Sequence, residues 1–220
     1  YTGQGLPTAP DEVMITTGAH QALVLLSEVY LRGAATVAVE APSWQPCLDV
    51  FRDAGAGVVP VPLDDEGIDE RRLAAVLAEH RPSVLYVMPT FHNPAGVLMS
   101  DRRRRRVAEL AARYDVAVIE DNAYAGCTLA REDAPEIPAP LSAYLPAGAE
   151  SVVVESLKAV WGGLRIGWIR GPRGLLQRCA RRKALADLGG PLIEQAGAAR
   201  LFPRLPEIVK GGSGERAERC

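Results

Sequence analysis

Short apolar runs rich in β-branched residues alternate along this chain with longer segments of helical periodicity. Runs such as Val84–Met88 and Val116–Glu120 are almost continuously apolar, which is typical of parallel strands covered on both faces. The alternation predicts a three-layer α/β/α fold with a mostly parallel, seven-stranded sheet. The expected strands are Val13–Thr16, Thr36–Glu40, Val58–Pro62, Val84–Met88, Val116–Glu120, Ser151–Val154 and Arg165–Arg170.

The expected helices lie between these strands. Ser100–Tyr114 begins with Ser100 and Asp101, two good N-cap residues, and continues with apolar residues at helical spacing. The other expected helices are Ala19–Leu31, Gln45–Ala54, Asp69–Glu79 and Gly174–Leu188. Loops rich in Pro and Gly follow several strand ends, where open α/β sheets bind their ligands. We therefore look for a functional site at those strand ends.

The composition fits one globular domain and argues against some partners. Hydrophobic residues make up 48% of the 220 positions, which is enough for a substantial core. The net charge of -2 favours neither nucleic acid nor an anionic membrane as a partner. The arginines at 102–106 fall in the first turns of a helix beside Asp101 and Glu109, with no interleaved aromatic residue. We interpret them as a solvated helix start.

Cysteine and histidine spacing predicts no metal site. The four cysteines lie far apart, in a pattern that fits neither zinc ligation nor a dense disulfide framework. The three histidines do not pair at metal-ligand spacing. The chain has no basic-then-apolar leader and no apolar run long enough for a transmembrane helix. We expect a soluble, cytoplasmic protein with reduced thiols.

Three loops that follow successive strands carry the reactive side chains. They are H-N-P-A-G at 92–96, E-D-N-A-Y at 120–124 and S-L-K-A-V-W-G-G-L-R at 156–165. Together they bring a carboxylate, a phenol, an amide, an ammonium and a guanidinium to one edge of the sheet. A lysine amine can form an imine, a carboxylate can hold a pyridinium proton, and an arginine can bind phosphate. The set suits an anionic aromatic cofactor that has a ring nitrogen and an aldehyde.

The ordered motifs N-P-x-G, D-x-x-Y and K-x6-R resemble those of fold-type I, pyridoxal 5'-phosphate (PLP) dependent aminotransferases of class I and II. The segments G-L-P-T-x-P-D-E, T-G-A-H-Q-A-L and W-G-G-L-R-I-G-W are most similar to the aminotransferase-like domain of the MocR subgroup of GntR-family regulators. The resemblance extends from Gly5 to Ile208, and it implies the large, cofactor-binding domain of such a protein.

The resemblance also implies a role for each site residue. Lys158 would form the Schiff base with PLP and move a proton during catalysis, and Asp121 would pair with the pyridinium nitrogen. Tyr124 and Asn93 would hydrogen-bond the phenolic oxygen of the cofactor. The phosphate would be bound by Arg165, Ser156 and the backbone amides of Gly18, Ala19 and His20, and Trp44 would stack on the ring.

Structural alternatives remain open for these residues. Asp121 could only cap the following turn, and Tyr124 and Asn93 could be structural hydrogen-bonding groups. Arg165 could form a surface ion pair, and Trp44 could belong to the core.

The sequence departs from the family pattern in two places. The family has S-x-S-K before the reactive lysine, whereas here Glu155, Ser156 and Leu157 precede Lys158. This places Ser156 one position out of step and is expected to bring the Glu155 charge towards the phosphate. We also expect the family's small C-terminal domain and a winged helix to be absent from this chain. We therefore expect a truncated PLP-binding domain over residues 1–210 and a disordered tail over 211–220.

Three functions remain open. The first is an aminotransferase that transfers an amino group from an amino acid to a 2-oxo acid. The second is a PLP-binding effector domain of a transcription regulator with little or no catalysis, and the third is an inactive fragment. The sequence alone leaves open whether the chain is an active enzyme. Family members generally form homodimers, so we expect a homodimer, with no nucleic acid bound by this chain alone.

Overall fold

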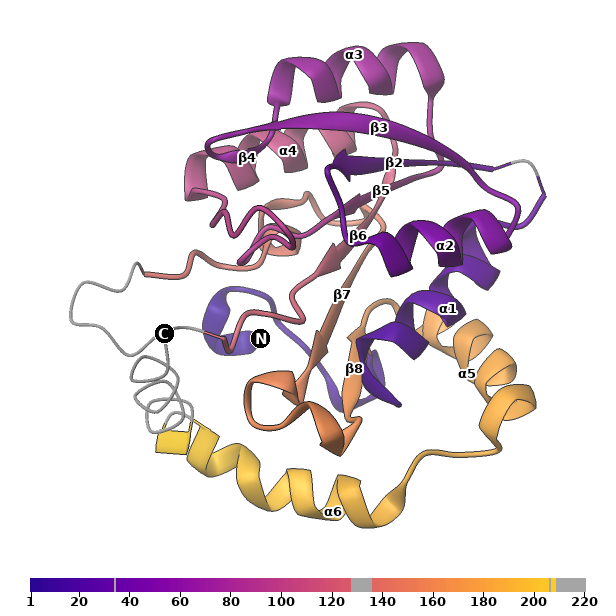
Figure 1. Cartoon of the computed structure of the whole chain (residues 1–220), viewed down its shortest axis with the longest axis vertical. Coiled ribbons are helices and arrows are strands. Elements are labelled where there is room, and N and C mark those ends of the chain that lie inside the picture. Colours follow the sequence, from indigo (N-terminus) through magenta and orange to yellow (C-terminus); the bar gives the residue numbers. More distant parts are fainter. Residues whose placement is uncertain (34, 128–135, 206, 209–220) are drawn as a thin grey trace.

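The computed structural model describes residues 1–33, 35–127, 136–205 and 207–208, and these build one sheet with helices on both faces (Figure 1). The predicted tail at 211–220 lies outside the described residues. The strands run in the order β1-β8-β7-β6-β5-β2-β3-β4. Their bounds are β1 Val13–Thr16, β2 Thr36–Ala41, β3 Gly57–Asp64, β4 Gly67–Ile68, β5 Val84–Val87, β6 Ala117–Asp121, β7 Ser151–Ser156 and β8 Gly167–Arg170.

The centre of the sheet is parallel, which confirms the predicted fold class. Strands β3, β2, β5, β6 and β7 pair in parallel, whereas β8 is antiparallel to both β7 and β1. The predicted number of seven strands is wrong, because the described residues form a sheet of eight. The additional strand is β4, which has two residues and is antiparallel to β3. A pair of residues is too short to produce an alternating or apolar pattern.

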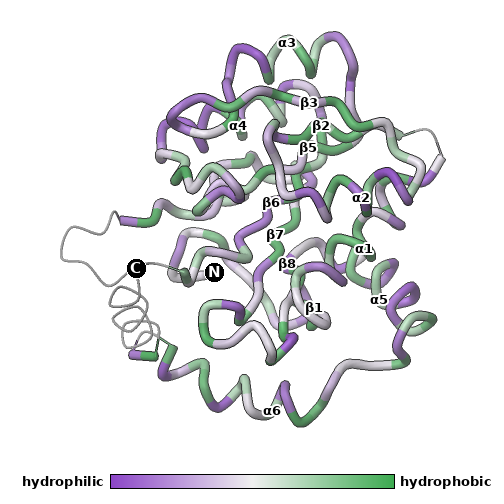
Figure 2. Tube along the Cα trace, in the orientation of Figure 1, coloured by the Kyte–Doolittle hydropathy of each residue, from purple (hydrophilic) through white to green (hydrophobic). Residues whose placement is uncertain are grey.

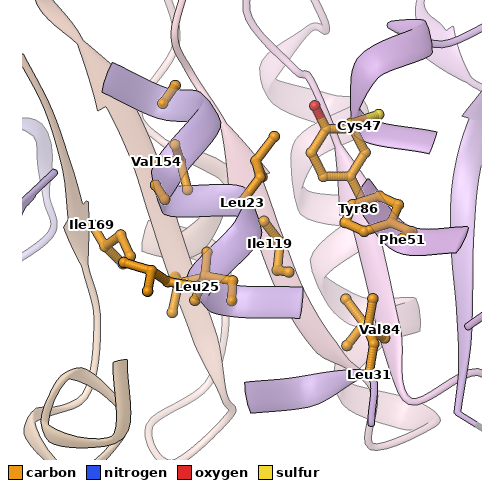
Figure 3. Packing of buried hydrophobic residues seen from close by; sticks show 14 of the residues in the cluster. Leu23, Leu25, Leu31, Cys47, Phe51, Val84, Tyr86, Ile119, Val154 and Ile169 are labelled. Carbon is orange, nitrogen blue, oxygen red and sulfur yellow. The ribbon is translucent and has the colours of Figure 1, made fainter. Parts of the chain in front are cut away.

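Two helical layers cover the sheet. Helices α1 (Gly18–Tyr30), α2 (Gln45–Asp53) and α5 (Arg173–Asp187) cover one face, and α3 (Glu70–His80) and α4 (Asp101–Arg113) cover the other (Figure 1). Figure 2 shows hydrophobic residues along the central strands and on the helices that pack there. In the first layer, Leu23 and Leu25 of α1 pack against Ile119, Val154 and Ile169 of the sheet (Figure 3).

Local capping explains why the helices begin where the sequence predicts. The Ser100 hydroxyl accepts a hydrogen bond from the Arg103 amide at 3.2 Å, and the Asp69 carboxylate accepts from the Arg71 amide at 2.8 Å. Helix α6 (Leu192–Leu201) is not among the predicted helices, since its apolar residues do not form one stripe. Short 3₁₀ helices occur at Thr2–Gln4, Pro10–Glu12, Leu141–Tyr144, Leu157–Ala159, Gly162–Leu164 and Phe202–Arg204.

The arginine run is only partly solvated, which corrects the interpretation made from the sequence. Arg103 and Arg104 are buried. The Arg104 guanidinium donates to the carbonyl oxygens of Pro89 at 2.9 Å and Met99 at 3.1 Å, and Arg103 pairs with Asp64 at 2.8 Å. Burial is possible because each of these guanidinium groups finds oxygen acceptors. Arg104 thereby anchors the loop that carries the H-N-P-A-G motif.

Two features are not found within the described ranges. None of their helices is both long and apolar enough to cross a membrane. Their His, Cys, Asp and Glu side chains form no group of three or more that could hold a metal ion.

Candidate functional site

One cavity at the strand ends collects almost all of the predicted site residues. It encloses about 200 Å³ and opens where β6 and β7 end and α1 begins. The predicted residues in its lining are Gly18, Ala19, His20, Trp44, Asp121, Tyr124, Ser156, Lys158 and Arg165. The remaining predicted residue, Asn93, reaches the site through a hydrogen bond to Tyr124. The three loops therefore converge as the sequence predicts.

Lys158, Tyr124 and Asn93 form one group at the cavity. The Lys158 Nζ atom lies 4.0 Å from the centroid of the Tyr124 ring, a cation–π contact. The Asn93 amide donates to the Tyr124 hydroxyl at 2.9 Å. A phenolic oxygen that accepts one hydrogen bond keeps its own proton for donation. Tyr124 can therefore donate to an oxygen in the cavity beside an exposed lysine amine.

Asp121 forms a buried acidic wall of the cavity. It is the last residue of β6, and one of its oxygens accepts from the Ala123 amide at 2.9 Å. The other oxygen accepts from the Tyr86 hydroxyl at 2.8 Å. Burial raises the pKa of Asp121, while the two hydrogen bonds and the Lys158 ammonium lower it. Such a carboxylate lacks a full counter-charge and would bind a protonated ring nitrogen.

The opposite end of the cavity is built from glycines and Arg165. A Cβ atom on Gly18 would lie 2.7 Å from the Arg165 Nη2 atom, so a side chain there would displace the guanidinium. The same Nη2 atom donates to the Thr17 carbonyl at 3.4 Å. Gly18 has φ 74° and is the first residue of α1, whose free amides favour an anion. Arg165 itself is exposed and lies before β8, not within it as predicted.

The end of β7 places Ser156 and Glu155 on opposite faces of the sheet. Ser156 lines the cavity, and its hydroxyl accepts from the Lys158 amide at 3.4 Å. Glu155 pairs across the sheet with Trp168 and hydrogen-bonds Tyr1. Burial raises the pKa of Glu155 to about 7. The expected approach of the Glu155 charge to the phosphate is therefore wrong, because side chains alternate along a strand.

Trp44 and His20 border the cavity from α2 and α1. Their ring centroids are 5.9 Å apart, with an interplanar angle of 88°. Trp44 is half-buried and is the residue just before α2, so its indole faces the cavity with one side packed on the core. This edge-on contact with His20 fixes an aromatic surface at the cavity wall.

Sequence reasoning missed several residues of the site. Tyr86 supports Asp121, and Met88, Trp161 and Ile166 line the cavity. Tyr86 and Met88 belong to a continuous apolar run, so they resemble ordinary core residues. Trp161 lies three residues after Lys158, and that position in the sequence was a usable signal. The structure shows its side chain exposed at the cavity.

Comparisons with known proteins agree with this geometry. The sequence pattern of the family "Aminotransferase class I and II" matches residues 1–201. The chain is 34% identical over 197 residues to an uncharacterized HTH-type transcriptional regulator, YisV, of Bacillus subtilis, in a match that covers 90% of this chain and 40% of YisV. It is 31% identical over 221 residues to the 2-aminoadipate transaminase of Thermus thermophilus, in a match that covers 100% of this chain and 53% of the transaminase.

Solved structures share the fold. The α-aminoadipate aminotransferase LysN of Thermus thermophilus, crystallised with N-(5'-phosphopyridoxyl)-L-leucine, has a TM-score of 0.78 and 31% sequence identity. The match covers 91% of this chain and 52% of that enzyme. The chain thus spans about half the length of the relatives it matches, or less. Since the family pattern covers nearly the whole chain, the protein belongs to the class I and II aminotransferase family.

Proposed function

We propose that this domain binds PLP and that the whole protein transfers an amino group from an amino acid to a 2-oxo acid. The observation that carries the proposal is the convergence of Lys158, Asp121 and Arg165 on one cavity. These side chains supply an amine for an aldehyde, a carboxylate for a ring nitrogen and a guanidinium for a phosphate. The donor set therefore fits PLP in both charge and chemistry.

Lys158 is the residue that would attach the cofactor and move protons. Its amine is exposed to the cavity and has no carboxylate within ion-pair distance among the described residues. When bound, PLP supplies an electron sink for a carbanion at the α-carbon of the amino acid. Lys158 would take the proton from that carbon as a general base and then deliver it to the cofactor as a general acid.

The surrounding residues would hold the cofactor in place. Asp121 would accept from the ring nitrogen, and Tyr124 would donate to the phenolic oxygen, with Asn93 fixing the Tyr124 hydroxyl. Arg165, Ser156 and the amides of α1, including those of Gly18, Ala19 and His20, would bind the phosphate. Trp44 would cover one face of the ring.

A second candidate is an effector domain that binds PLP without rapid turnover. The similarity to HTH-type transcriptional regulators supports this alternative. The two candidates share one cofactor site and differ in their response to an added amino acid. An aminotransferase releases a 2-oxo acid, whereas an effector domain with slight turnover releases little.

We also propose that the domain pairs with a second copy of itself. Support comes from exposed apolar side chains at the end of α5 and the start of α6, where Leu188 is 93%, Leu192 78% and Ile193 86% exposed. Figure 1 shows α6 at the margin of the molecule. Sedimentation of the chain and of Ile193→Glu tests this, because a dimer through α6 would dissociate in the variant.

Cofactor attachment is the decisive test of the proposed function. The chain has three lysines, Lys158, Lys183 and Lys210, so chemical trapping can be assigned without ambiguity. We expect PLP followed by borohydride reduction to label the peptide that contains Lys158. Mass spectrometry of the digested chain reads the position, and Lys158→Ala should lose the label and the visible absorbance of bound cofactor.

Lys210→Ala is the matched control and should bind PLP as the wild type does. Equal labelling of all three lysines, or none in the wild type, contradicts the proposal. With the cofactor bound, a panel of amino acids separates the two candidates by the amount of 2-oxo acid released per site.

A further inference from the structure

Tyr86 is a buried polar side chain that the proposed mechanism leaves without a role. It is the third residue of β5 and has no exposed surface. Its ring packs on Phe51 at a centroid distance of 5.3 Å and an angle of 71°. Its hydroxyl lies beside Cys47 (Figure 3), with which it also interacts by a hydrogen bond. A phenylalanine would fill the same space, so packing does not require the hydroxyl.

The hydroxyl of Tyr86 is directed at the acidic wall of the cavity. It donates to Asp121 Oδ2 at 2.8 Å, while the Ala123 amide donates to Oδ1 at 2.9 Å. The two bonds fix the plane of the carboxylate. Each carboxylate oxygen can accept more than one hydrogen bond, so a free acceptor position remains on the side that lines the cavity.

We propose that Tyr86 is the positioning residue for Asp121: its hydroxyl orients this carboxylate and keeps it ionised to receive the ring nitrogen of the cofactor. The inference rests on the proposed function, because it acts on the same site. Sheet register explains the geometry. Tyr86 pairs with Ile119, so Asp121 lies two residues further along β6 on the same face.

The electrostatics around Asp121 show why such a donor matters. Burial raises the pKa of Asp121, and so does the nearby Glu40 carboxylate, whereas Lys158 and the two hydrogen bonds lower it. Burial also raises the pKa of Tyr86 far above its usual value, so the phenol remains a donor. The titratable groups around Asp121 are Glu40 of β2, Cys47 of α2, Tyr86 of β5, Glu155 of β7 and Lys158.

The test compares Tyr86→Phe with the wild-type chain in two ways. The first is a carboxyl carbon NMR titration of the chain without cofactor, with the Asp121 signal assigned by its loss in Asp121→Asn. We expect the pKa of Asp121 to rise in Tyr86→Phe. The second is PLP affinity at neutral pH. We expect about tenfold weaker binding in Tyr86→Phe, since a hydrogen bond to a charged group is lost.

Phe51→Leu is the matched control, because it disturbs the same aromatic pair and keeps the hydroxyl. An unchanged Asp121 titration in Tyr86→Phe, or an equal change in Phe51→Leu, overturns the inference. A raised pKa with unchanged PLP affinity overturns it as well. Failure of the proposed function gives a different result. The wild type itself would then bind no PLP, while the titration without cofactor would still report on the hydrogen bond between Tyr86 and Asp121.

Discussion

The two ends of the cavity are built in different ways. At the end proposed to hold the cofactor ring, called the ring end, Asp121 and Tyr86 stand on neighbouring strands, both are buried, and their hydrogen bond is 2.8 Å long. At the end proposed to hold the phosphate, called the phosphate end, Arg165 lies in a turn, is exposed, and reaches the Thr17 carbonyl only at 3.4 Å. The first end depends on side chains fixed by sheet register, and the second depends on a close approach of backbone segments.

This contrast indicates what each end contributes. A buried carboxylate with two donors is already oriented, so a ligand there needs little reorganisation. An exposed guanidinium keeps its hydration and side-chain freedom until an anion binds, and salt screens it. Changes at the phosphate end should therefore act either through the backbone or through a salt-dependent charge.

Gly167→Val tests the backbone approach and has the largest expected effect. A Cβ atom at Gly167 would lie 2.5 Å from the Gly18 carbonyl carbon and 2.7 Å from the Ala19 amide nitrogen. Strand β8 and the start of α1 would have to separate, which should lower the free energy of unfolding by about 3 kcal/mol. Urea unfolding measures the loss. PLP binding should also fall, because the displaced amides belong to the phosphate end.

Gly162→Ala is the control for this change, since a Cβ atom there meets no atom within 4 Å. It should unfold at nearly the same urea concentration as the wild type. If Gly167→Val unfolded at the same urea concentration as the wild type, the close approach of β8 to α1 would not be needed for stability.

Arg165→Gln tests the exposed charge and should have a smaller effect. We expect the PLP dissociation constant to increase about tenfold, because a charged, bidentate donor to phosphate is lost. The affinity of the variant should also depend less on salt than that of the wild type. Fluorescence titration at two salt concentrations measures both. Arg173→Gln, at an exposed arginine that pairs with Asp11, is the control and should leave both values unchanged.

Much of this site could be predicted because its residues belong to motifs that follow strands. Asp121 ends β6, Lys158 and Arg165 lie between β7 and β8, and the order of the strands brings these segments together. Tyr86 could not be found in this way. A tyrosine within an apolar run is typical of a core strand, and only the register with β6 shows that its hydroxyl meets a carboxylate.

Other parts of the structure could not be predicted from the sequence pattern. The two residues of β4 and the mixed surface of α6 carry too little periodicity. The run of arginines predicts a solvated Arg104. The sequence cannot show that the carbonyl oxygens of Pro89 and Met99 accept hydrogen bonds from its guanidinium. The face on which Glu155 lies could not be predicted either, because the exact end of β7 decides which way each side chain points.

Glu155→Gln tests that last point and should have the smallest effect. Burial raises the pKa of Glu155 from 4.5 to about 7, so between these values the folded chain binds the proton more tightly than the unfolded chain. The stability contributed by this group is therefore present at low pH and is lost as the pH rises through about 7. The variant should lack this decline in urea unfolding between pH 5 and 7, roughly the interval in which only the folded state holds the proton. Its PLP affinity should equal that of the wild type, because Glu155 faces Trp168 and Tyr1 and not the cavity. Tighter PLP binding in Glu155→Gln would instead mean that the carboxylate acts on the phosphate end, and the separation of the two faces at β7 would be wrong.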